Sequence, residues 1–443
     1  MKKAKRVLCL AIVFVMSFVL SSCTSVFDSG EALINAPSLF ADQKKIMNAL
    51  SWSVGEKITL VSARKGENRS AILLCDMDAD GQKEAVAFYK TASATVSSDT
   101  VHINVLDKNN KGQWYSLCDT VGLAAAIDTV AVGTFSNTSE IVVGWEVIKD
   151  REKTLVCYSL SDKNLIREYS APYIEFAVAD FRAGDNSEII TLNYVPNTES
   201  TSIPLQEARL IVKDKGLFKV LSSAQLDSRV TGYKTCIAGK YDSENIGYFI
   251  DGQIDANNVT TQILTVSKNG ELLNPLLNPD GKTSEDNRRK IGLAIQDFGS
   301  DGVLKVPYQE AVVGYENKSE SEIIYKTVWK ALDGNTFKRS ALSYVNQSLS
   351  LEIVIPEKLD GKVTIKPSMA QNEIVFYEYE GSLEQSENAL FSIRSVKKEQ
   401  YQKQEGYDIL ISNEYITVTV KIFDGDNDLC PTLSTLYEMV NIL

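Results

Sequence analysis

The sequence has one histidine, one long apolar run and none of the common catalytic signatures, and each shortage excludes a class of protein. With His102 as its only histidine, the chain lacks the ligands for His-rich zinc or iron sites, which also argues against a Ser-His-Asp triad. A single long apolar run excludes a multi-span membrane protein. No GxSxG, P-loop, HExxH or GxGxxG motif occurs, so the sequence offers no catalytic residue.

The composition is that of an acidic globular protein. Apolar residues make up 44% of the 443 residues and charged residues 23%, which is enough apolar material for the two or three domains that the length suggests. The net charge is −12, which disfavours nucleic acid and anionic lipid headgroups as partners.

The first residues have the three parts of an export signal. A basic start precedes an apolar run over 7–20, which is short for a transmembrane helix, and Ser21, Ser22 and Cys23 follow. Residues 20–23 resemble a bacterial lipobox. The resemblance implies cleavage before Cys23, a diacylglycerol thioether on its sulfur and acyl chains such as palmitate that hold the protein to the extracytoplasmic face of the cell membrane. The alternative is an ordinary secretory signal with a chance cysteine.

Processing at Cys23 would define the N-terminal part of the chain. Residues 1–22 would be the signal peptide and 23–34 the lipidated cysteine with its tether. Loss of the four basic residues of the signal would take the net charge from −12 to −16. Beyond the lipidated Cys23 the chain has five cysteines, an odd number with no CxxC pair, and we expect free, mostly buried thiols.

An apolar strand, a polar turn and a second apolar strand recur five times. A large apolar residue precedes each turn, and these residues are 46 to 60 positions apart: Met77, Phe135, Phe181, Tyr241 and Phe298. A further predicted strand pair follows each copy, so each repeat has four strands, the content of one propeller blade. The sequence therefore predicts a mainly β chain with a β-propeller of about five blades over 35–345. A β-sandwich and a β-solenoid are the alternatives.

Three of the turns resemble FG-GAP/VCBS repeats, the integrin-α-like propeller class. The resemblance is carried by residues 76–81 with Glu84 and by two Asp-Phe pairs at 180–181 and 297–298. It covers roughly residues 70–345 and implies a propeller. We also expect a short helix over 38–50 and a strand within 55–64 that closes the ring against the last blade.

The first turn has the spacing of a metal site. Asp76, Asp78 and Asp80 alternate, and we expect their carboxylates to converge with the Gln82 carbonyl and Glu84 on a calcium ion. In FG-GAP-like repeats such a loop binds calcium and stiffens the blade. The alternative is an acidic turn that is satisfied by side-chain to backbone hydrogen bonds. A second acidic cluster at 424–428 has no carboxylate at the right distance, and we interpret it as a solvated turn.

The repeat ends near residue 345. Short β-branched strands follow, beginning with 349–356, and an apolar stripe after Pro431 predicts a C-terminal helix, so residues 346–443 are expected to form an α+β domain. The function that fits best is a surface-anchored binding or scaffold module for a protein or glycan ligand. One alternative is a propeller-type carbohydrate-active hydrolase or lyase with paired carboxylates, and another is a regulatory or envelope-assembly role for the C-terminal domain.

Overall fold

The computed structural model describes residues 36–92, 99–149, 151–195, 205–368 and 372–443, with side chains from Asp42 onward. The mainly β expectation is confirmed: the described strands form six antiparallel sheets of four or five strands each. The predicted signal peptide, Cys23 and tether lie outside the described residues.

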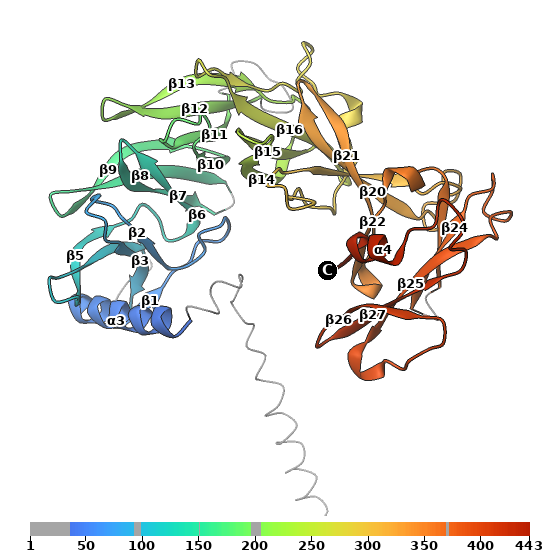
Figure 1. Cartoon of the computed structure of the whole chain (residues 1–443). Coiled ribbons are helices and arrows are strands. Elements are labelled where there is room, and N and C mark those ends of the chain that lie inside the picture. The colour runs from blue at the N-terminus through green and yellow to red at the C-terminus, as the bar shows by residue number, and fades with distance from the viewer. Residues whose placement is uncertain (1–35, 93–98, 150, 196–204, 369–371) are drawn as a thin grey trace, which may run out of the picture.

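The second and third sheets are meanders in chain order, and in the first sheet the first two strands both pair with the third, which the fourth and fifth strands follow (Figure 1). The first sheet contains β1 (Ile58–Leu60), β2 (Ile72–Cys75), β3 (Glu84–Thr91), β4 (His102–Lys108) and β5 (Trp114–Val121). The second contains β6 (Ile127–Phe135), β7 (Thr138–Ile148), β8 (Glu152–Ser161) and β9 (Asn164–Pro172). The third contains β10 (Glu175–Ala179), β11 (Glu188–Tyr194), β12 (Gln206–Asp214) and β13 (Leu217–Gln225).

The remaining sheets each have five strands. The fourth contains β14 (Gly232–Lys240), β15 (Ile246–Gln253), β16 (Asn258–Val266), β17 (Leu272–Leu273) and β18 (Arg288–Lys290). The fifth contains β19 (Val306–Ala311), β20 (Tyr325–Asp333), β21 (Thr336–Asn346), β22 (Leu351–Val354) and the last strand, β28 (Val440–Ile442). The sixth contains β23 (Val363–Ser368), β24 (Glu373–Glu378), β25 (Ala389–Lys397), β26 (Asp408–Ser412) and β27 (Ile416–Ile422).

The helical elements are few. The α-helices are α3 (Ala36–Val54) and α4 (Leu433–Met439), and the 3-10 turns are η1 (Glu285–Asn287), η2 (Gln347–Leu349), η3 (Glu357–Leu359) and η5 (Lys398–Gln400). The expected C-terminal helix is shorter than predicted because Val440 and the residues after it pair with β22 as a strand.

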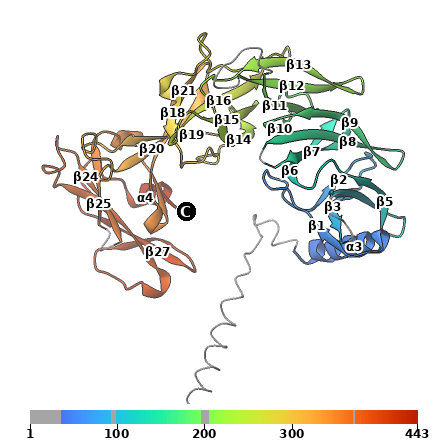
Figure 2. The ribbon, with the colours of Figure 1, turned by 180° about the vertical axis from the view of Figure 1, so that it is seen from behind.

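The six sheets follow one another along an arc, and both views show it (Figures 1 and 2). Neighbouring sheets share apolar cores. One core joins Phe135 of the second sheet to Ile189 of the third, the next joins Leu192 to Tyr248 of the fourth, and another joins Phe249 to β19 and β20 of the fifth. Each sheet therefore shields a face of its neighbour, which explains why the middle strands are buried on both faces.

Burial is greatest in the middle strands of the sheets and lower in the strands on either side. The third-sheet strand β11 is buried along almost its whole length, whereas the outer strands β5, β9 and β13 alternate between buried or half-buried and exposed residues. In Figure 1 these three strands lie on the convex side of the arc, and β6, β10 and β14 lie on the concave side. The pre-turn residues Met77, Phe135, Phe181 and Phe298 are buried between sheets, and Tyr241 is half-buried.

The expected ring-closing strand lies elsewhere. β1 pairs with β3 of its own sheet, in the register Ile58 to Thr91, and not with the last blade. Pairing with a nearby strand closes a much shorter loop, so it costs less chain entropy. Helix α3 also packs on the first sheet, where Ile46 and Leu50 contact Ala85 and Ala87. The first sheet thus has a helix against one face.

The strands after residue 345 do not all belong to one sheet, although the sequence predicted that residues 346–443 form a separate domain. The segment 349–356, which was expected to open a separate domain, contributes β22 to the fifth sheet, and the end of the chain returns to that sheet as β28. β23 to β27 form the sixth sheet, whose core side packs against the fifth. The five described cysteines are free, as expected, and Cys75 and Cys157 are buried.

Candidate metal centre

The acidic loop connects β2 to β3 in the first sheet. Glu84 is the first residue of β3 and pairs with Cys75 across the hairpin, so the strand register holds Asp76 and Glu84 at the two ends of the loop. Between them the backbone turns through Ala79 at φ 61° and Gly81 at φ 87°, the left-handed region that glycine adopts without strain. The loop thereby folds back toward the paired strand ends that it connects.

Three carboxylates meet inside this turn. Asp76, Asp78 and Glu84 each offer one oxygen, and these oxygens lie within 4.8 Å of one another. Glu84 is only 1% exposed, and its Oε2 accepts a hydrogen bond from the Met77 N–H at 2.6 Å. Its Oε1 and the Oδ1 of Asp76 are buried and have no hydrogen-bond partner. Oxygens of this kind are what a hard divalent cation coordinates.

Burial, together with the neighbouring carboxylates, shifts the pKa of two groups of the site. Burial, reinforced by the carboxylates of Asp78, Asp107 and Asp76, raises the pKa of Glu84 to about 7, although the Met77 N–H opposes the shift. Burial also raises the pKa of Asp78. Among the described residues no lysine, arginine or histidine forms an ion pair with the cluster, so its negative charge is not compensated by the chain.

One of the predicted carboxylate ligands, Asp80, lies outside the cluster. Asp80 is exposed, and its Oδ1 accepts the Gln82 N–H at 2.7 Å. The Gln82 side chain also donates to Asp80, at 3.3 Å. The hydrogen bonds expected of an acidic turn without metal are also present. Asp78 accepts the Asp80 N–H, and Asp76 accepts the Gly81 N–H. Those bonds leave Glu84 Oε1 and Asp76 Oδ1 unpaired.

The third repeat builds the same loop with its own cation. Glu188 accepts the Phe181 N–H at 2.9 Å, as Glu84 accepts the Met77 N–H, and Asp180 accepts the N–H groups of Gly184 and Asp185. Arg182 stands at the position that corresponds to Asp78 and donates from Nε to Glu188 Oε1 at 2.7 Å. The buried glutamate is thus neutralised within the loop.

Two other loops also compensate their buried charge. In the second repeat Glu140 forms an ion pair with Lys213 from the third sheet. In the fifth repeat Lys305 replaces the glutamate, and its Nζ lies 2.8 Å from Asp301. The sequence shows this substitution: Glu84, Glu188 and Lys305 each follow the loop aspartate by eight residues. Among these loops only the first has a buried charge without a partner in the described chain.

Other residues considered from the sequence have structural partners. His102 places Nδ1 2.9 Å from Asp119 Oδ1, and Tyr89 donates to the other oxygen of that carboxylate at 2.5 Å. In the segment 424–428, Asn427 accepts the Leu429 N–H, in keeping with a turn before α4. Within the described ranges, the Asp76, Asp78 and Glu84 group is the one cluster with metal-ligand geometry.

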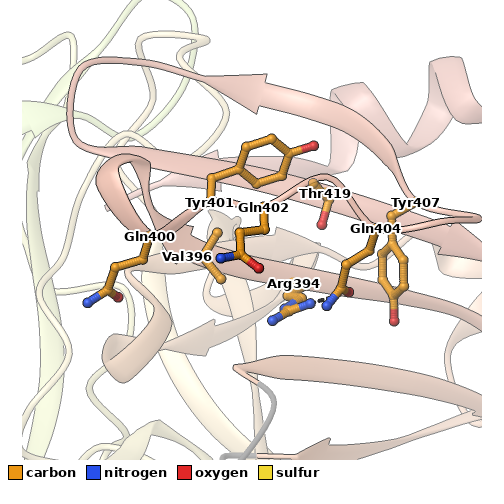
Figure 3. Close-up of a pocket in the computed structure, with 8 residues that line it drawn as sticks. All are labelled: Arg394, Val396, Gln400, Tyr401, Gln402, Gln404, Tyr407 and Thr419. Atoms are coloured by element: carbon orange, nitrogen blue, oxygen red, sulfur yellow. Dashed lines mark hydrogen bonds between the residues drawn. The ribbon is translucent and has the colours of Figure 1, made fainter.

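Two pockets were not anticipated from the sequence. One, of about 650 Å³, lies beside the fifth loop and contains Asp297, Asp301 and Glu352. Asp297 is held there by the N–H groups of Asp301 and Gly302. The other is a small pocket around Arg394 on the sixth sheet (Figure 3). The large pocket combines residues from distant strands and turns, whereas the Arg394 pocket is formed mostly by residues 394–407, which carry no recognisable motif.

Comparisons with known proteins leave the family open. No family model matches the chain, and no curated protein matches it. A solved structure of a protein from Lactobacillus plantarum matches with 10% identity, a TM-score of 0.25 and coverage of 66% of this chain and 90% of the other. A hypothetical protein from Leishmania major matches with 8% identity, a TM-score of 0.24 and coverage of 65% and 90%. In the part of the chain that the structure describes, no helix has the length and apolar character needed to cross a membrane.

Proposed function

We propose that this protein is an exported lipoprotein, attached through Cys23 to the extracytoplasmic face of the membrane, that acts as a binding or scaffold module. Its sheets are blades of a β-propeller-like assembly, and a structural calcium ion in the Asp76, Asp78 and Glu84 loop stiffens the first blade. The observation that carries the calcium proposal is the buried Glu84, because its counterparts Glu140 and Glu188 have cationic partners and it has none among the described residues.

The blade proposal is supported by the order of the strands. In the second and third sheets the first strand of a four-strand meander lies toward the concave side of the arc and the fourth lies on the convex side. Propeller blades have this arrangement. Two acidic residues of the large pocket beside the fifth loop, Asp297 and Asp301, are engaged in hydrogen bonds within the loop, which supports a structural role for these two.

Thermal unfolding with and without calcium tests the metal proposal. We expect calcium to raise the melting temperature of the full chain, since it binds the folded loop and the unfolded chain lacks the site. Asp78→Ala should remove this response, and Asp80→Asn should retain it, because Asp80 lies outside the cluster. No calcium response in the wild-type chain would refute a calcium site.

Two further measurements test the anchor and the binding role. Metabolic labelling with palmitate should mark the wild-type chain in a bacterial host, and Cys23→Ser should lose both the label and membrane sedimentation. Incubation with cell-wall and mucin glycans should show retention of glycan without release of products. Release of shorter glycans would instead establish the hydrolase or lyase alternative.

A further inference from the structure

The two faces of the sixth sheet have different characters. Phe391 and Ile393 of β25 point into the apolar core that this sheet shares with the fifth. Arg394 alternates with them and lies on the other face, next to Thr419 of β27, its partner across the strands. The connection 398–407, between β25 and β26, covers this second face and supplies most of the pocket around Arg394.

Arg394 has no anionic partner within the described residues. Its Nη1 donates to the Gln404 side-chain oxygen, and its Nε is shielded from solvent and has no hydrogen-bond partner. Glu373 lies opposite Arg394 on β24, but no ion pair joins them, and Glu373 Oε1 accepts the Tyr407 hydroxyl at 2.7 Å. The guanidinium thus keeps at least one donor, Nε, without an acceptor, which costs free energy in the folded state.

The pocket wall is polar and neutral apart from the arginine. Gln400, Gln402 and Gln404 line it together with Tyr401 and Tyr407. In Figure 3 the Gln404 amide meets the Arg394 guanidinium and the Gln402 side chain lies beside them. The amides can both donate to and accept from hydroxyl groups, and the arginine supplies a planar pair of donors.

Size and charge restrict the ligand. A cavity of about 90 Å³ holds a carboxylate with the ring edge that carries it, and the rest of a larger ligand would lie outside. A phosphate dianion would need more positive charge than the single guanidinium that lines the pocket. A planar carboxylate matches one guanidinium, and hydroxyl groups next to it match the glutamine amides.

We propose that this pocket binds the carboxylate of an acidic sugar, with Arg394 as its anion partner and Gln402 and Gln404 as partners of the neighbouring hydroxyl groups. The ligand class is a glycan that contains uronic acid. This inference rests on the proposed binding role and specifies its ligand, but an experiment can refute the pocket without refuting the role. The binding role survives if neutral glycans bind at another surface.

Isothermal titration of the full chain in mild detergent tests the proposal with an oligogalacturonate as probe. The neutral oligosaccharide of galactose and a short peptide with a free C-terminal carboxylate serve as the comparison ligands. We expect the oligogalacturonate to bind and the other two to bind at least about tenfold more weakly, because only the first offers both the carboxylate and adjacent hydroxyls. Arg394→Gln should weaken binding of the oligogalacturonate by about tenfold or more, and Arg394→Lys should restore part of it.

Matched variants separate the pocket from general effects. Arg69→Gln removes an exposed arginine of the same charge on the first sheet and should leave binding unchanged. Gln402→Ala should weaken binding without changing the fold, which circular dichroism checks for every variant. The proposal is overturned if no oligogalacturonate binds, if the peptide binds as tightly, or if folded Arg394→Gln and Gln402→Ala proteins bind as well as the wild type.

Discussion

Arg182 donates a hydrogen bond to Glu188 at the place where the first loop brings Asp78 beside Glu84. The two loops otherwise share their geometry: the glutamate accepts the N–H of the buried residue that precedes the turn, and an aspartate accepts N–H groups from the far side. A buried carboxylate needs a counter-charge or a proton. One loop supplies a guanidinium, and the other has the ligand set for a cation from solution.

Asp78→Arg should convert the first loop to the type of the third. The new guanidinium would neutralise Glu84, so we expect the calcium response to disappear while the melting temperature without calcium rises. Thermal unfolding with added calcium and with a chelator measures both effects. Asp80→Asn is the control that should leave the calcium response intact. A calcium response that persists in Asp78→Arg would place the metal elsewhere.

Arg182→Asp should convert the third loop in the opposite direction. Removing the partner of a buried charge typically costs about 3–5 kcal/mol, so the variant should be strongly destabilised in the absence of metal. The carboxylates of Asp180, Glu188 and the introduced aspartate should then make stability depend on calcium. Denaturant unfolding at several calcium concentrations tests this expectation. Destabilisation that calcium does not relieve would show that the loop geometry alone is insufficient for binding.

Glu84 should make the stability of the calcium-free protein depend on pH. Its pKa is raised from 4.5 to about 7 in the folded state, so the folded chain keeps the proton that the unfolded chain has lost between these values. The folded state then holds more protons, and stability falls as the pH rises through this window. The loss should reach the order of 3 kcal/mol above about pH 7.

The comparison variant for this pH effect is Glu84→Gln, which cannot ionise. Subtracting its pH profile from that of the wild type, both with a chelator present, isolates the contribution of Glu84. We expect the wild type to lose stability relative to the variant between pH 4.5 and about 7, and added calcium to reverse the loss. A difference that stays constant across this range would mean that Glu84 titrates normally.

The repeated strands could be predicted because each is a local pattern. The apolar runs around residues 71–90 and 176–195 become β2 with β3 and β10 with β11, joined by the expected turns. Long-range pairing was harder. The segment that forms β1 carries no signal that distinguishes β3 from the last sheet, and β28 joins β22 across most of the C-terminal part, which no local pattern encodes.

The acidic loop shows the same division between local and distant information. The alternation of Asp76, Asp78 and Asp80 marks the site, but the positive φ of Ala79 and the bond from Gln82 turn Asp80 away from it. The role of Lys213 as partner of Glu140 depends on two sheets meeting in space. In the Arg394 pocket only Thr419 depends on strand register, and the rest comes from 394–407, a segment without a recognisable motif.

The ion pair of Lys213 with Glu140 should hold the second and third sheets together. Lys213 of β12 and Glu140 of β7 have side chains that are 9% and 1% exposed, and burial raises the pKa of Glu140 while the lysine opposes that shift.

Lys213→Met would leave a buried carboxylate unpaired, which should cost about 3–5 kcal/mol at neutral pH. Adding Glu140→Gln should recover most of this loss, since the double variant buries no charge. Urea unfolding of both single variants and the double variant measures the coupling. Additive effects would show that the two residues act independently and that this ion pair does not hold the sheets together.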